Sequence, residues 1–132
     1  MINFKTIHTT LKNLIVAKGF KYVTSDKWFN FEYGIFPVGT HNNGYTIRPS
    51  SARKTEEYEA DDWSDSPWTV EFCLSGVNDT YLSKIGKALD AIRNLEGNTG
   101  TNIVQIEFAG WNIEHYDKHV ILTFDIALTI NE

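Results

Sequence analysis

Apolar residues recur at helical spacing in two segments of the chain. In the first, residues 4–18, one face is apolar and the opposite face is polar, and Asn3 is placed to cap the N-terminus. In the second, an apolar stripe runs to Leu95 after a cap at Asn78 or Asp79. The two patterns predict two amphipathic helices, each with one face directed at a core.

Alternation of apolar and polar residues, typical of half-buried strands, marks most of the remaining chain. It predicts extended segments at residues 20–23, 28–36, 45–48, 68–75, 103–113 and 119–130. A short turn separates the last two, which we expect to form a hairpin. In the first of these two strands, the large apolar residues are even-numbered just before Gly110 and odd-numbered after it, which predicts a β-bulge there.

The order of helix, strands, helix and hairpin predicts an α+β fold with two layers. We expect a mixed or antiparallel sheet of about five strands, covered on one face by two helices, with a polar second face that meets either water or another wet surface. A chain of 132 residues with 42% hydrophobic residues has the size of one domain and is not intrinsically disordered. We therefore predict a single domain over residues 1–132.

A long polar segment, residues 50–67, interrupts the alternation. It carries six acidic and two basic residues, with Tyr58 and Trp63 among them. Such a segment is either a solvated loop or an arm that becomes ordered against a partner, and the two large aromatic side chains favour the arm. Tyr58, Trp63, Glu56 and Glu57 are therefore candidate subunit-interface residues.

The chain lacks the motifs of the common catalytic and cofactor sites, among them glycine-rich phosphate loops, the nucleophile elbow and HExxH. The single cysteine, Cys73, lies in a predicted strand and is expected to be a structural thiol. Residues 114–119 hold four potential metal ligands, but His115 and His119 would lie about 13 Å apart along a strand. We expect a polar turn there, and no enzyme, metal or cofactor.

The charge balance, 17 acidic against 12 basic residues, argues against tight binding to a phosphate backbone. An RNA-binding sheet that uses Phe29 and Phe31 would need a basic platform, which this chain lacks. No apolar run is long enough to span a bilayer, and the N-terminus has no secretory-signal pattern.

The whole layout resembles the tail terminator (tail completion) proteins of tailed phages. The likeness rests on the Ala17-Lys18-Gly19-Phe20 helix end, the polar insertion before Trp68–Leu74, the helix Leu82–Leu95 and the closing strand Ile121–Leu128. The resemblance implies a ring, commonly a hexamer, that caps the tail tube, ends its polymerisation and joins it to the head. Its partners would be its own copies, the tube protein and a head completion or connector protein.

This resemblance also implies a part of the virion tail that assembles in the host cytoplasm and has no active site. DNA would pass through the lumen without specific binding, which an acidic chain permits. Glu71 and Asp125 fall on the polar sheet face and are the candidate lumen residues.

The alternative is a small-ligand or peptide-binding α+β module of the cytoplasm. It would use the aromatic stretch at residues 28–36 together with Trp111. Such a module requires a cavity of about 300 Å³ or more beneath Phe29 and Phe31.

Overall fold

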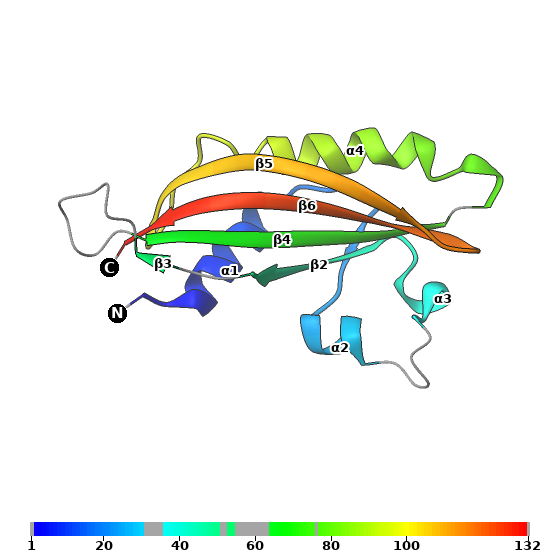
Figure 1. The fold of residues 1–132 in the computed structure, drawn as a ribbon, viewed down its shortest axis with the longest axis horizontal. Coiled ribbons are helices and arrows are strands. Elements are labelled where there is room, and N and C mark those ends of the chain that lie inside the picture. The colour runs from blue at the N-terminus through cyan, green and yellow to red at the C-terminus, as the bar shows by residue number, and fades with distance from the viewer. Residues whose placement is uncertain (1, 31–35, 51–52, 55–63, 76, 132) are drawn as a thin grey trace.

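Figure 1 shows the computed structural model, which describes residues 2–30, 36–50, 53–54, 64–75 and 77–131. The elements in chain order are α1 (Phe4–Leu14), β1 (Lys21–Tyr22), α2 (Ser25–Phe29), α3 (Val38–His41), β2 (Gly44–Pro49), β3 (Arg53–Lys54), β4 (Ser64–Ser75), a 3₁₀ turn (Val77–Asp79), α4 (Leu82–Arg93), β5 (Ile103–His115) and β6 (His119–Ile130).

The strands form one mixed sheet. Its order is β1-β2-β4-β6-β5, and the short β3 pairs with β4. Only β1 and β2 run parallel among these pairs, and every other pair is antiparallel. The predicted α+β fold with a mixed or antiparallel sheet is confirmed.

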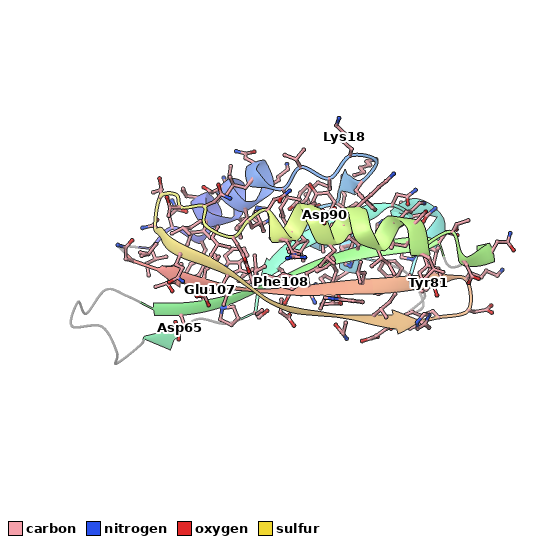
Figure 2. All side chains as sticks on the ribbon, turned by 90° about the horizontal axis from the view of Figure 1, so that it is seen from above. Lys18, Asp65, Tyr81, Asp90, Glu107 and Phe108 are labelled. Atoms are coloured by element: carbon pink, nitrogen blue, oxygen red, sulfur yellow. The ribbon has the colours of Figure 1, made fainter. Side chains whose placement is uncertain are left out.

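The inner face of the sheet is the face that packs against α1 and α4 (Figure 2). Successive side chains of a strand point to opposite faces, so alternate positions of the three long strands point to the inner face. Residues that are direct partners across two antiparallel strands lie on the same face. Phe72 of β4 pairs with Tyr45 of β2 and with Leu122 of β6, and all three are buried. The helices contribute Ile7, Leu11, Ala88, Ile92 and Leu95 to the same core.

Helix α1 begins where the sequence predicts and ends four residues early. The Asn3 side chain accepts a hydrogen bond from the backbone N–H of Thr6 at 3.1 Å, as expected for an N-cap. The helix ends at Leu14, and Ile15 adopts an extended backbone while its side chain remains 5% exposed. β-Branched residues at 15 and 16 favour this exit from the helix.

The strand predicted at residues 28–36 is wrong at its start, because Ser25–Phe29 forms helix α2. Trp28 is 1% exposed and Phe29 is 51% exposed, so the turn of helix buries one aromatic ring and presents the next to solvent. The burial of the Trp28 ring outweighs the strand propensity of aromatic residues. Residues 31–35, including Phe31, lie outside the described residues.

Two further boundaries differ from the sequence predictions. β4 begins at Ser64, so residues 64–67 belong to the sheet and not to the polar insertion. Asn78 and Asp79 do not cap α4; both have positive φ in the 3₁₀ turn, and Tyr81 precedes the helix. The β5–β6 hairpin is confirmed, and so is the bulge at Gly110, where the register shifts and φ is +140°.

The outer face, opposite to α1 and α4, is only partly open to water. Helix α2 lies against one end of it, because Trp28 contacts Glu71 there and Ser25 contacts Thr46. Helix α3 lies beside α2, with His41 stacked on Trp28. Over the rest of the described sheet, the outer face of β5 and β6 has no helix upon it. At the α2 end, the face that was expected to meet water or another wet surface is therefore covered by a helix of the same chain.

Candidate functional site

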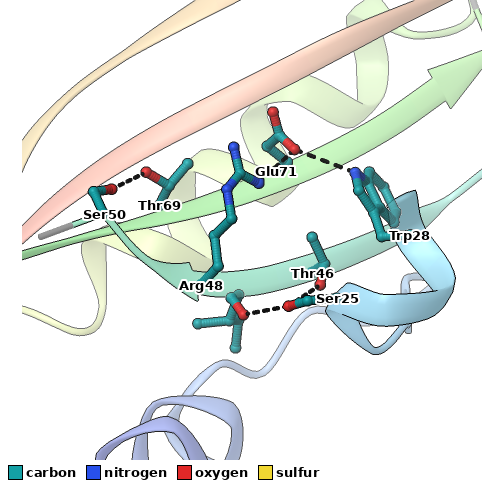
Figure 3. Close-up of polar contacts among 8 residues, drawn as sticks. Ser25, Trp28, Thr46, Arg48, Ser50, Thr69 and Glu71 are labelled. Atoms are coloured by element: carbon teal, nitrogen blue, oxygen red, sulfur yellow. Dashed lines mark hydrogen bonds and ion pairs between the residues drawn. The ribbon is translucent and has the colours of Figure 1, made fainter. Parts of the chain in front are cut away.

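A small polar network fastens α2 to the outer face (Figure 3). The carboxylate of Glu71 accepts hydrogen bonds from Arg48 Nη1 at 2.7 Å and from Trp28 Nε1 at 3.2 Å. The Ser25 hydroxyl donates to the carbonyl oxygen of Ile47 at 3.2 Å. These contacts give the half-buried Glu71 both a cation and a neutral donor, which offsets its loss of hydration.

Aromatic rings form a continuous ladder beside this network. Trp28 stacks on His41, with ring centroids 5.1 Å apart and planes 2° apart. Phe36 contacts Trp28 edge-on at 5.3 Å and stacks on His119 at 5.5 Å. His119 in turn stacks on Tyr116 at 4.7 Å. The ladder joins α2 and α3 to the β5–β6 turn, although these segments are far apart in sequence.

The ladder and the network enclose a pocket that is open on one side, with a volume of about 370 Å³. The residues that line it are Trp28, Phe29, Phe36, Glu71, Glu114, Tyr116, His119 and Ile121. Burial lowers the pKa of His119 below its usual value of 6.5, so the imidazole is neutral at pH 7.

The carboxylate of Glu114 lies at the rim of this pocket. The Tyr116 hydroxyl donates a hydrogen bond to Glu114 Oε2 at 2.6 Å. This hydrogen bond is the main cause that raises the pKa of Tyr116 above its usual value of 10, so the phenol remains neutral. The pocket therefore combines neutral aromatic groups with two carboxylates.

The open part of the outer face is acidic. Register places Glu107, Glu114 and Asp125 on it, and all three are exposed. Within the described strands β2, β4, β5 and β6, Arg48 is the one cation on this face, and it is paired with Glu71. The open face therefore carries net negative charge.

The candidate lumen residues Glu71 and Asp125 lie on one face, as the alternation predicts. Their surroundings differ. Asp125 is exposed on the open part, whereas Glu71 is covered by Trp28 and neutralised by Arg48. Of the two candidates, Asp125 is therefore the one open to solvent, and Glu71 belongs to the polar network beside the pocket.

The candidate interface residues Glu56, Glu57, Tyr58 and Trp63 lie outside the described residues. At the base of that segment, Arg53 pairs with Asp65 and Lys54 with Ser64 in an antiparallel register. The two ends of the polar insertion thus approach each other as the two sides of a hairpin.

The β5 strand, 13 residues long, forms one edge of the sheet. Within the described residues, no strand pairs with β5 along the edge that points away from β6. The Glu96 carboxylate accepts a hydrogen bond from the backbone N–H of Phe108 at 2.9 Å and so occupies one donor of this strand. Trp111 of the same strand is 45% exposed.

Three other sequence expectations concern reactive or membrane chemistry. Cys73 is buried, and burial raises the pKa of its thiol to about 12, which makes it unreactive at neutral pH. His115 and His119 lie on opposite faces of the sheet, and the described residues include no group of three or more potential metal ligands. None of the described helices has the length and apolar character needed to cross a bilayer.

The sequence predicts only part of this pocket. Of the aromatic stretch 28–36 expected around a cavity, Trp28, Phe29 and Phe36 line this pocket, and Phe31 lies outside the described residues. Trp111, which was expected at the same cavity, pairs with the inner-face residue Phe124 and lies on the opposite side of the sheet. The turn at residues 114–119, for which the sequence predicts exposure to water, supplies three lining residues.

A scan of the chain against models of known protein families finds no match, and a search among curated protein sequences finds none either.

Proposed function

We propose that this protein is a tail terminator of a tailed phage, forming a ring, commonly a hexamer, that caps the tail tube and joins it to the head. Its partners are then its own copies, the tube protein and a head completion or connector protein. It is assembled in the host cytoplasm and resides in the virion tail.

The observation that carries the proposal is the long edge of β5, with which no second strand among the described residues pairs and on which Trp111 is exposed. Such an edge offers a template for pairing, and monomeric proteins usually shorten or cover it. A ring closes through a heterologous interface, in which an edge of one subunit meets a different surface of the next. An edge strand with an exposed tryptophan suits one half of that interface.

The acidic outer face supports the second half of the proposal, passage of DNA. Negative charge at Glu107 and Asp125 repels phosphate and avoids the affinity that counterion release would give. A lumen lined by this surface lets DNA slide without binding it specifically.

The test is the assembly state of the purified chain, with and without tube protein, measured by light scattering and negative-stain microscopy. We expect rings, either alone or on the tube. Trp111→Ser should weaken assembly by about 2 kcal/mol and leave the melting temperature nearly unchanged. The control is Leu82→Ser, because Leu82 is also exposed, at 56%, but lies at the start of α4. A monomer under all conditions would contradict the proposal.

A charge reversal tests the lumen assignment separately. The wild-type chain should not retard duplex DNA in a mobility-shift assay, whereas Glu107→Lys with Asp125→Lys should give salt-sensitive, sequence-independent retardation. The control pair Asp90→Lys with Asp117→Lys makes the same change in net charge at exposed positions of α4 and of the β5–β6 turn. Equal DNA binding by both pairs would show that net charge alone matters.

A second candidate function, a small-ligand or peptide-binding module, is favoured by one observation. The pocket of about 370 Å³ exceeds the size that such a module requires and is lined by Phe29.

A further inference from the structure

The pocket on the outer face has a chemical character of its own. Trp28, Phe29, Phe36 and Tyr116 give it aromatic walls, and Glu71 and Glu114 add carboxylates. The described lining residues include no lysine or arginine. Aromatic faces and carboxylates both attract cations, and the two together define a site for an organic cation.

The charges around the pocket favour a cation further. Arg48 already compensates Glu71, but Glu114 receives its hydrogen bond from a neutral phenol. In the described part of the chain, no cationic group lies within ion-pair distance of Glu114. His119 adds no positive charge at pH 7, because burial lowers its pKa. One uncompensated negative charge therefore faces an aromatic cavity.

A neighbouring side chain shows how such a cation is held. The Arg48 guanidinium carbon lies 5.0 Å from the centroid of the Phe29 ring while Nη1 contacts Glu71. One cation thus lies on an aromatic face and against a carboxylate at the same time. The pocket repeats this pairing of ring and carboxylate with Tyr116 and Glu114.

We propose that this pocket binds an arginine or lysine side chain presented by another polypeptide. The pocket is open on one side, so it can enclose the end of a side chain while the main chain that carries it stays outside. Its volume lies within the usual range of ligand sites, about 300–1,000 Å³. The site is formed within one folded chain, so the proposal does not depend on ring assembly.

The probes are three capped tripeptides, Gly-Arg-Gly, Gly-Lys-Gly and Gly-citrulline-Gly, together with tetramethylammonium chloride. Each is titrated into the ¹⁵N-labelled chain, and the indole N–H resonance of Trp28 is followed by NMR. We expect saturable shifts with the arginine and lysine peptides, and affinity about tenfold weaker for citrulline, which has the shape of arginine without its charge.

Two exposed residues of the pocket provide the variants. Glu114→Gln and Tyr116→Leu should each lower the affinity for the arginine peptide about fivefold, because each removes one partner of the cation. The matched control is Glu107→Gln, which makes the same charge change on the same open face but outside the pocket lining. It should leave the affinity unchanged.

Three outcomes would overturn the inference. Equal affinity for the citrulline and arginine peptides would make the site apolar and not cation-selective. An equal loss of affinity for the arginine peptide in Glu114→Gln and Glu107→Gln would show that only the net charge of the face matters. Tight binding of tetramethylammonium without binding of either basic peptide would make this a site for a small free cation. Light scattering of the same samples reports assembly independently, so failure here is distinguishable from failure of the ring.

Discussion

The two faces of the central sheet are made by the same strands and differ in burial and in charge. Along β6, alternate residues from Val120 to Ile130 are apolar and buried beneath α1 and α4. The residues between them are mixed, and Asp125 is exposed. The inner face is therefore expected to supply most of the stability, while the outer face holds charge, a pocket and an acidic surface available to partners.

The largest expected effect concerns the inner face. Phe72 packs against the rings of Phe20, Tyr45 and Phe124, with centroids 5.0–5.6 Å apart. Phe72→Ala should reduce the free energy of unfolding by about 3–5 kcal/mol, because it leaves a cavity in the core. Urea denaturation monitored by circular dichroism measures it. Thr123→Ala, on the outer face, is the control and should cost less than about 1 kcal/mol.

A smaller effect is expected at the polar network of the outer face. Arg48→Leu leaves Glu71 half-buried with only the Trp28 donor, and should cost about 1–2 kcal/mol. The loss should shrink at 1 M salt, which screens the ion pair in the wild-type chain. Arg93→Leu, on the exposed side of α4, is the control. An equal loss of stability in the two variants would show that the network does not stabilise the fold.

A third prediction concerns the helix that covers the inner face. Asn3→Ala removes the side-chain acceptor for the backbone N–H of Thr6 and should cost about 1 kcal/mol in urea denaturation. Asn13→Ala, inside the same helix, is the control and should be neutral or slightly stabilising, because alanine is the better helix former. A neutral Asn3→Ala would mean that the cap contributes nothing.

The smallest expected effect is the pH dependence that histidines on both sides of the sheet produce. Burial lowers the pKa of His8, near the inner face, and of His119, on the outer face, below 6.5. The unfolded chain therefore takes up these protons at higher pH than the folded chain does. Stability should fall as the pH drops through and below 6.5.

Melting temperatures measured between pH 8 and pH 5 check this dependence. His8→Gln and His119→Gln should each make the decline shallower, and the double variant should make it shallower than either. An unchanged slope in all three variants would assign the decline to carboxylates alone.

Local patterns in the sequence determined the elements whose environment is regular. The apolar stripe of α4 and the strict alternation of β6 predict their buried faces, apart from the exposed Leu82 at the start of α4, because each period is set by backbone geometry. Asn3 and Gly110 were predictable for the same reason: a cap and a bulge are local events. The class of fold follows from their order.

Tertiary structure alone decided the helix at Ser25–Phe29 and the pocket beside it. Trp28 is held by Glu71 and by His41, which are 43 and 13 positions further along the chain, so no local window reveals its environment. Glu71 is likewise covered by Trp28 and paired with Arg48, and both contacts join residues that are far apart in the sequence. Strand pairing brings Glu114 and His119 to this pocket, because cross-strand neighbours depend on register and not on sequence distance.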